Sequence, residues 1–241
     1  MLDKYDITSF EKDLSVYGLS LEKRQMCQLL KYYELLVHWN SFMNLTGITA
    51  YEEVLKKHFI DSLSLASCFD LSQVKTVIDI GTGAGFPGIP LKIAFPHLEI
   101  TLLDSLNKRI TFLDTVIQEL NLEGIQTVHG RAEDYAKPGK LREQFDISVS
   151  RAVANLATLS EYCLPFVKKD GYFISYKSEK AIEEIASAKN AVRILGGSLE
   201  EQKEFTLPDS DINRTLVFIK KEKETPKKYP RKAGLPSKEP L

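Results

Sequence analysis

The pattern of hydrophobic and polar residues divides the chain near residue 76. Upstream of this point, apolar residues recur every three or four positions, which predicts amphipathic helices over residues 8–17, 21–37 and 51–67. The long helix is expected to bury a face that includes Leu29, Tyr33 and Leu36. Downstream, short apolar runs alternate with helical segments, and this alternation is typical of a parallel sheet covered by helices.

The expected elements of this downstream region form one sheet. Strands are expected at residues 77–80, 99–104, 125–129, 145–150 and 172–176, and helices at residues 88–95, 107–120, 155–167 and 179–195. Two last runs, 199–207 and 214–220, predict a hairpin that places one antiparallel strand in the sheet. We therefore predict an α/β fold with a seven-stranded, mostly parallel sheet (71–221), an N-terminal helical region (1–70) and a basic C-terminal tail (222–241).

The most informative stretch is Val77-Ile78-Asp79-Ile80-Gly81-Thr82-Gly83-Ala84-Gly85-Phe86-Pro87-Gly88, a strand that runs into a glycine-dense turn. A turn without Cβ atoms before a helix lets a ligand approach the backbone. Read from Gly83, the spacing matches the dinucleotide motif GxGxxG, and read from Gly81 it matches the methyltransferase turn GxGxG. Because the strand ends at Ile80, the second interpretation is favoured. A tight turn without any ligand is the alternative.

Three carboxylates add to this interpretation. Asp79 lies two residues before Gly81, where it would repel a pyrophosphate and attract a donor with an amine and a sulfonium, such as S-adenosylmethionine. Asp104 ends the second strand, a position from which it can accept hydrogen bonds from ribose hydroxyls. Glu133 follows the third strand and can accept from an adenine amino group. The alternatives are a helix N-cap for Asp104 and an exposed acidic loop for Glu133.

The end of the fourth strand, Ser148-Val149-Ser150-Arg151-Ala152, restricts the kind of methyl acceptor. It has no Asn/Asp-Pro-Pro-aromatic sequence to hold an exocyclic amine, and no Pro-Cys pair to attack a pyrimidine. This favours an acceptor that is itself a nucleophile, such as guanine N7. In-line displacement at the methyl group would then depend on proximity and orientation, without a general base.

Composition and charge narrow the class of protein. The chain has 241 residues, 43% of them hydrophobic, enough for one substantial core. Its three cysteines fit neither a metal site nor a disulfide framework, and no apolar run reaches the ~18 residues of a membrane span. We therefore expect a cytoplasmic protein without a metal or a membrane partner.

The net charge of −1 hides a basic C-terminal end. Residues 220–241 hold eight Lys/Arg and three Asp/Glu, a balance of 8 − 3 = +5, which leaves −6 for the rest of the chain. Such a tail is typical of proteins that bind a polyanionic partner. The alternative is a solvated, frayed terminus.

The chain resembles the bacterial RsmG family, also called GidB or glucose-inhibited division protein B. The motifs that carry the resemblance are Trp39-Asn40, Asn44-Leu45-Thr46, His58-Phe-Ile-Asp61-Ser62-Leu63, the glycine turn, Leu103-Asp104-Ser105-x-x-Lys108-Arg109, Ser150-Arg151-Ala152 and Tyr229-Pro230-Arg231-x-x-Gly234-x-Pro236. This resemblance implies a Rossmann-like class I methyltransferase fold. It also implies transfer of a methyl group from S-adenosylmethionine to N7 of a guanine in 16S rRNA of the small ribosomal subunit.

The resemblance also implies roles for individual residues. It implies contacts to the donor from Gly81, Phe86, Ala132, Glu133 and Arg151, and the turn and the second strand add Gly83, Gly85 and Asp104 to these. Arg151 and Lys177 are the expected catalytic residues and face the RNA. Further RNA contacts are expected from Asn44, His58, Asp61, Lys228 and Arg231. Ser178 replaces the glycine that the family commonly has after this lysine, so backbone contacts there are in doubt.

Three other functions are compatible with parts of the sequence. The core motifs also fit a methyltransferase for a small molecule or another nucleic acid, although the +5 tail favours RNA. An NAD-binding oxidoreductase would need a catalytic domain for which no residues are left after the sheet. A non-catalytic RNA-binding module would not need the three carboxylates around the turn.

Overall fold

The computed structural model of the protein describes residues 2–178 and 181–241. The α-helices are α1 Thr8–Val16, α2 Lys23–Met43, α3 Tyr51–Val54, α4 Asp61–Leu63, α5 Gly88–Ala94, α6 Asn107–Glu119, α7 Ala132–Tyr135, α8 Leu156–Cys163, α9 Ala181–Ile194 and α10 Leu235–Lys238. A π-helical stretch, Leu55–Ile60, joins α3 to α4, and a 3-10 turn, Ser64–Ser67, follows. Helical structure therefore spans residues 51–67, as the sequence predicts.

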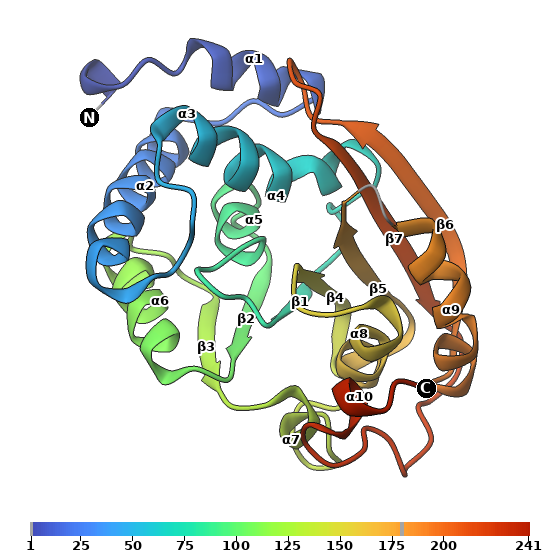
Figure 1. Ribbon diagram of the computed structural model, residues 1–241. Coiled ribbons are helices and arrows are strands. Elements are labelled where there is room, and N and C mark those ends of the chain that lie inside the picture. The colour runs from blue at the N-terminus through green and yellow to red at the C-terminus, as the bar shows by residue number, and fades with distance from the viewer. Residues whose placement is uncertain (1, 179–180) are drawn as a thin grey trace.

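Seven strands form a single sheet (Figure 1). They are β1 Thr76–Ile80, β2 Glu99–Asp104, β3 Ile125–His129, β4 Phe145–Arg151, β5 Val167–Lys177, β6 Gly197–Thr206 and β7 Asn213–Lys221, in the order β3-β2-β1-β4-β5-β7-β6. Only β7 runs antiparallel to its neighbours β5 and β6. The predicted seven-stranded, mostly parallel sheet with one antiparallel strand is thus confirmed.

Alternate residues of the strands face two hydrophobic cores. Val77 of β1 packs into the core under α2, α5 and α6, whereas Ile78 and Ile80 pack into the core under α8 and α9. Helices accordingly cover both faces of the sheet (Figure 1). Strands β1 and β2 are buried along almost their whole length because both faces of the sheet are covered there, as expected for parallel strands.

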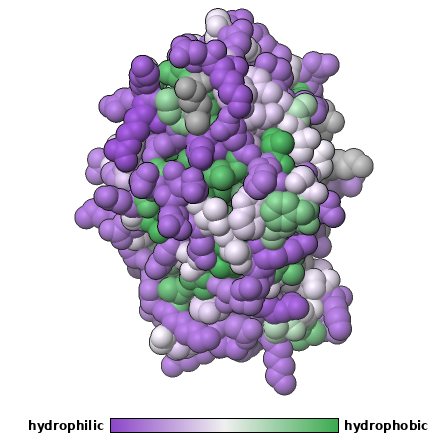
Figure 2. All heavy atoms as spheres, turned by 90° about the vertical axis from the view of Figure 1, so that its left-hand side faces the viewer, coloured by the Kyte–Doolittle hydropathy of each residue, from purple (hydrophilic) through white to green (hydrophobic). Residues whose placement is uncertain are grey.

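The N-terminal helices belong to the first core. In α2, Leu29, Tyr32 and Leu36 are completely buried, whereas Tyr33 is only partly buried. Tyr33 therefore packs against this core at its edge, and the neighbouring Tyr32, which the sequence pattern did not single out, is the residue at its centre. The outer face that carries α2 and α6 is mainly hydrophilic, with hydrophobic atoms exposed in small separate groups (Figure 2).

The fifth strand and the helix before it differ from the sequence prediction. The helix expected to reach residue 167 ends as α8 at Cys163, and β5 begins at Val167 rather than at Tyr172. The early part of β5 is polar and exposed, and Asp170 has a left-handed φ of 69°. These features hide the strand in the sequence. The first two residues of the predicted helix at 179–195 lie outside the described residues.

Candidate active site

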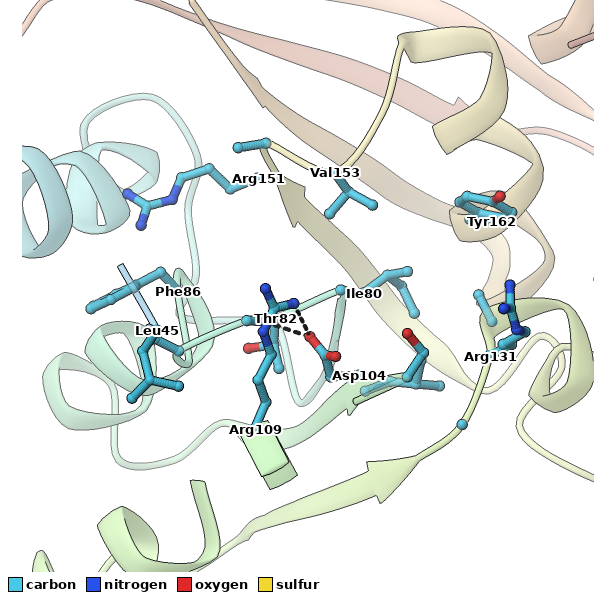
Figure 3. A pocket seen from close by; sticks show the side chains of 18 of the residues that line it. Leu45, Ile80, Thr82, Phe86, Asp104, Arg109, Arg131, Arg151, Val153 and Tyr162 are labelled. Atoms are coloured by element: carbon cyan, nitrogen blue, oxygen red, sulfur yellow. Dashed lines mark hydrogen bonds and ion pairs between the residues drawn. The ribbon is translucent and has the colours of Figure 1, made fainter. Parts of the chain in front are cut away.

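A cavity of about 500 Å³ lies at the carboxyl ends of β1, β2 and β4. This edge is where ligands bind in doubly wound sheets. Figure 3 shows Phe86 and Arg151 on one side of the cavity, Tyr162 and Arg131 on the other, and Asp104 between them. Its lining includes all but one of the predicted donor-binding residues, namely Gly81, Gly83, Phe86, Asp104, Ala132, Glu133 and Arg151.

The glycine turn adopts a backbone that other residues rarely take. Gly81, Gly83 and Gly85 have φ values of 69°, 63° and 98°. A Cβ at Gly81 would lie 2.6 Å from Val153, and one at Gly85 would lie 2.6 Å from Ile89, so both positions exclude side chains. At Gly83 the nearest atom to such a Cβ is 3.9 Å away, so its backbone borders open space in the cavity. Gly85, which does not line the cavity, serves packing instead.

Asp79 lies behind the turn rather than in the cavity. It is fully buried, and its Oδ2 accepts hydrogen bonds from Thr82 Oγ1 (2.7 Å) and from the backbone N–H of Gly88 (2.9 Å). Burial raises the pKa of Asp79 to about 6. The expectation that this carboxylate faces a donor is therefore corrected, since it holds the turn against the start of α5.

Asp104 lines the cavity with its carboxylate already oriented. Its Oδ2 accepts from the backbone N–H of Gly83 (2.9 Å) and from Arg109 Nη1 (3.1 Å), and its Oδ1 accepts from the N–H of Leu106 (2.9 Å). Asp104 thus joins the end of β2 to the turn after β1. The alternative of a helix N-cap is wrong, because Leu106 is the N-cap of α6 and no side chain caps it, whereas Asp104 does line the cavity.

Glu133 stands on the opposite side of the cavity at the start of α7. It is 3% exposed, and its Oε1 accepts a hydrogen bond from the backbone N–H of Gly234 in the C-terminal segment (2.8 Å). The exposed acidic loop considered as an alternative is therefore ruled out for this side chain. Burial raises the pKa of the neighbouring Tyr162 hydroxyl.

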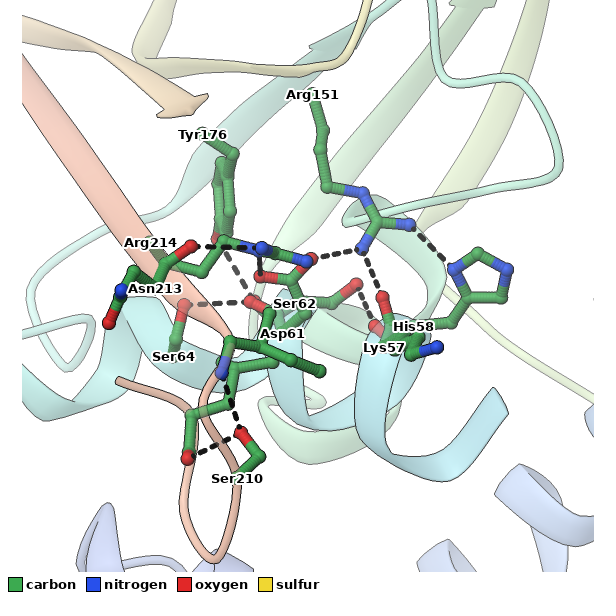
Figure 4. Close-up of polar contacts among 12 residues, drawn as sticks. Lys57, His58, Asp61, Ser62, Ser64, Arg151, Tyr176, Ser210, Asn213 and Arg214 are labelled. Carbon is green, nitrogen blue, oxygen red and sulfur yellow. Dashed lines mark hydrogen bonds and ion pairs between the residues drawn. The ribbon is translucent and has the colours of Figure 1, made fainter. Parts of the chain in front are cut away.

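Arg151, at the end of β4, is held from several sides (Figure 4). Its Nη1 donates to Asp61 Oδ2 (3.0 Å) and to the carbonyl of Lys57 (3.2 Å), and its Nη2 lies 3.2 Å from His58 Nδ1. The guanidinium also lies 5.0 Å from the centre of the Phe86 ring. The side chain is therefore fixed between the glycine turn and the N-terminal helices.

His58 supports Arg151 as a neutral imidazole. Its ring stacks on Phe86 with centroids 4.5 Å apart, and its Nε2 lies 2.9 Å from Thr46 Oγ1. Burial, with the charge of Arg151, lowers the pKa of His58 to about 4. We infer that Nδ1 accepts from Arg151 and that Nε2 carries the proton, because a guanidinium can only donate.

A second cavity of about 530 Å³ lies on the other side of Arg151. It shares four lining residues with the first, namely His58, Arg151, Ala152 and Val153. Its charged lining residues are Lys57, Arg151, Lys177, Arg214, Asp61 and Glu184, a balance of 4 − 2 = +2. Lys177 Nζ donates to Glu184 Oε2 (2.6 Å) and to the carbonyl of Ala154 (2.8 Å). Both predicted catalytic residues thus line this cavity.

The other residues predicted to contact RNA are more widely spread. Asp61 lines the second cavity but is buried between Arg151 and Arg214, so both of its oxygens orient these side chains. Asn44 and Lys228 are exposed but line neither cavity. Arg231 forms an ion pair with buried Glu161, and this commits its guanidinium to the protein rather than to RNA. The prediction that Arg231 faces RNA is corrected accordingly.

Sequence reasoning missed three side chains that shape the site. Tyr32 donates to the carbonyl of Ala84 in the glycine turn. Arg109 pairs with Asp104, and Arg214 Nε donates to Asp61 Oδ1 (2.9 Å). Only Arg109 had a local signal, since it lies five residues after Asp104 on the following helix. Within residues 2–178 and 181–241, no cluster of three or more His, Cys, Asp or Glu side chains is arranged to hold a metal ion.

The sheet order, the single antiparallel strand and the cavity beside a GxGxG turn define the class I methyltransferase fold. Solved methyltransferases share it. The mitomycin 7-O-methyltransferase MmcR aligns with a TM-score of 0.56 and 14% identity over 78% of this chain and 60% of its own. The M. jannaschii TYW2 structure in complex with AdoMet aligns with a TM-score of 0.50 and 15% identity over 62% and 70%.

The family follows from much closer relatives. The family model GidB, described as rRNA small subunit methyltransferase G, matches residues 25–215. Ribosomal RNA small subunit methyltransferase G of Lachnoclostridium phytofermentans is 57% identical over 98% of both chains, and that of Alkaliphilus metalliredigens is 56% identical over 93% of this chain and 94% of its own. The chain therefore belongs to the GidB family of rRNA methyltransferases, which confirms the resemblance drawn from its motifs.

Proposed function

We propose that this protein, acting in the cytoplasm, transfers the methyl group of S-adenosylmethionine to N7 of a guanine in 16S rRNA. The observation that carries the proposal is the pair of cavities that meet at Arg151. The first is bordered by the glycine turn and by the carboxylates of Asp104 and Glu133, and the second is lined by four basic and two acidic side chains. A methyl donor and an RNA nucleobase need two adjoining sites of this kind.

The first cavity fits the donor. Gly83 leaves the backbone open toward the cavity, and Asp104 is fixed at the end of β2, where a ribose can hydrogen-bond to it. Glu133 stands across the cavity, where it can accept from the adenine amino group. When bound, S-adenosylmethionine would supply a methyl group on a positively charged sulfur. The N7 lone pair forms the new N–C bond as the C–S bond breaks, and neutral S-adenosylhomocysteine leaves.

The second cavity fits an unstacked guanine. Lys177 uses two hydrogen-bond donors on Glu184 and Ala154, and an ammonium group has a third. We assign this third donor to guanine O6, because lysine recognises the O6/N7 edge of guanine and the N7 lone pair must stay free. Arg151 forms the wall between the two cavities, so its fixed position aligns the guanine with the methyl group.

No residue needs to remove a proton in this reaction. Guanine N7 carries a lone pair and no hydrogen, so methylation leaves a cationic base and releases no proton. His58 agrees with this assignment, because both of its ring nitrogens are occupied by Arg151 and Thr46. Its role is to hold Arg151 rather than to act as a base.

Two measurements test the proposal. Calorimetric titration should give binding heat with S-adenosylmethionine and none with NAD, and the reverse pattern would reject it. Lys177→Gln should raise the KM for 16S rRNA by about 10-fold or more while the Kd for S-adenosylmethionine stays unchanged. Lys168→Gln is the matched control, since Lys168 is also an ion-paired lysine of β5 but lies at its other end. Equal effects of the two substitutions would contradict the assignment of Lys177.

A further inference from the structure

The C-terminal segment that follows β7 is docked along its length. Arg142 donates to the carbonyls of Thr225 and Tyr229, the latter at 2.8 Å. Glu143 Oε1 accepts from the N–H of Thr225 (2.8 Å), and the Thr225 hydroxyl donates to the carbonyl of Leu195 (2.9 Å). Thr225 and Tyr229 are buried. This contradicts the sequence-based alternative of a frayed, solvated terminus.

The next contact of the C-terminal segment is with Glu161 of α8. Glu161 is completely buried, and its Oε1 accepts from the backbone N–H of Arg231 (2.7 Å). The guanidinium of Arg231 adds a two-pronged contact, with Nε 3.0 Å from both carboxylate oxygens and Nη2 2.6 Å from Oε2. A planar guanidinium that faces a buried carboxylate in this way fixes the path of the chain.

Three residues further on, the chain reaches the donor cavity. Gly234 takes a left-handed φ of 82° and donates its N–H to Glu133 Oε1. The hydroxyl of Thr158, on α8, donates to the carbonyl of Pro236 (3.1 Å), so the chain is held on both sides of Gly234. In Figure 1 the final helix α10 lies between α7, which carries Glu133, and α8. Among the residues that the structure describes, none donates to the second oxygen of Glu133.

We propose that residues 225–238 form a strap that positions Glu133 for the methyl donor. Arg231, Thr158 and the backbone of Gly234 act as positioning groups, because each holds the segment that fixes one oxygen of Glu133 and leaves the other toward the cavity. Arg231 thus serves donor binding instead of RNA binding. The inference rests on the proposed function, since it takes the first cavity as the donor site.

The basic charge of the strap is separable from this role. Lys227, Lys228 and Lys232 are exposed, whereas Arg231 is ion-paired to Glu161. Neutralising these lysines removes charge and leaves the hydrogen bonds of Arg231, Thr158 and Gly234 in place, although Lys228 also lies 5.2 Å from the centre of the Tyr229 ring. Loosening an anchor moves Glu133 with little change in the charge presented to RNA. Donor affinity and the salt dependence of RNA binding therefore report on different residues.

The experiment uses calorimetry with S-adenosylmethionine and salt-dependent binding of 16S rRNA on full-length variants. Arg231→Gln should raise the Kd for S-adenosylmethionine by about 10-fold and Thr158→Val by about 3-fold. Both should keep the slope of log K against log salt. The Lys227→Gln, Lys228→Gln, Lys232→Gln variant should keep the donor Kd unchanged.

The outcomes separate this inference from the proposed function. If the unsubstituted protein binds no S-adenosylmethionine, the proposed function fails. If it binds the donor and Arg231→Gln keeps that affinity while the salt slope falls, the strap inference is overturned and Arg231 contacts RNA. Thr158→Val protects the test against a folding defect in Arg231→Gln, because it changes no charge and removes one hydroxyl. Unchanged donor affinity in a folded Thr158→Val variant also counts against the strap.

Discussion

The Nη1 atom of Arg151 lies 3.0 Å from Oδ2 of Asp61, and this contact joins the end of β4 to the N-terminal helices. The other oxygen of Asp61 binds Arg214 of β7, so one buried carboxylate serves two arginines. The N-terminal region therefore contributes to the wall between the two cavities. In the function that we propose, this region positions the residue at which donor and acceptor meet.

Asp61→Asn should lower both stability and activity. The substitution leaves two partly buried guanidinium groups without a counter-charge, and breaking a buried ion pair costs about 3 kcal/mol of the free energy of unfolding. Urea unfolding checks the stability effect. Asp70→Asn is the control, because Asp70 is exposed. Similar midpoints for the two variants would show that Asp61 does not hold the arginines.

Arg151→Lys should fold and bind the donor but transfer methyl groups slowly. An ammonium group keeps the charge but cannot reach Asp61, Lys57 and His58 with the fixed geometry of a guanidinium. We expect the single-turnover rate to fall about 100-fold, as for a misplaced positioning group. Arg193→Lys, on the exposed face of α9, should leave the rate unchanged. A wild-type rate in Arg151→Lys would remove this residue from the alignment step.

Gly83→Val should abolish measurable donor binding. The substitution forces a β-branched residue into a left-handed φ of 63° and puts its side chain at the border of the cavity. Gly139→Val is a matched control, since Gly139 also has a left-handed φ, 79°, and open space around it, but does not line the cavity. Calorimetry should show a loss of donor affinity of at least about 100-fold in the first variant only. Equal affinities would contradict the placement of the donor.

His58→Gln should make the protein less sensitive to acid. The pKa of His58 is about 4 in the folded protein and about 6.5 for an ordinary histidine, so the unfolded chain binds more protons between these pH values. The neutral His58 therefore adds to the free energy of unfolding at pH 7, and this contribution, about 3 kcal/mol in total, is lost as the pH falls from 6.5 to 4. Glutamine keeps an acceptor for Arg151 and a donor for Thr46 without titrating. Chemical unfolding at pH 7 and pH 4 checks the difference.

Asp79 titrates in the same range with the opposite sign. Its raised pKa, about 6, makes the folded protein bind a proton more readily than the unfolded chain, which adds stability as pH falls. Asp79 is present in the wild-type protein and in the His58→Gln variant, so its contribution cancels when the pH dependences of their stabilities are compared. If the two proteins lose the same stability between pH 7 and pH 4, His58 is not held neutral by the fold.

The sequence predicts the sheet and the donor side of the site because their signals are local. The apolar strands, the GxGxG turn, Asp104 and Glu133 each follow from residues within one strand and the turn after it. Tyr32 was missed because it adjoins Tyr33, and helical spacing from Leu29 permits either residue to face the core. Local patterns therefore resolve the type of an element better than the orientation of one side chain.

The second cavity and the C-terminal strap depend on contacts between distant parts of the chain. Asp61 and Arg214 are 153 positions apart, and Glu161 and Arg231 are 70 apart. Single-sequence patterns carry no information about such pairs. The family resemblance and the basic charge of the tail led to the prediction that Arg231 faces RNA, whereas a buried carboxylate on α8 determines where it lies. Polar residues also hid the start of β5, since a strand that is exposed there needs no apolar alternation.

Methylation of 16S rRNA by the purified protein, with S-adenosylmethionine labelled in its methyl group, tests the central claim most directly. Borohydride reduction followed by aniline cleaves RNA at 7-methylguanosine, so the modified position and the modified atom are read together. The two-cavity account predicts labelled RNA that is cleaved at a guanine, and no label with Gly83→Val. Label on another base, on an exocyclic amine or only on a small molecule would contradict it.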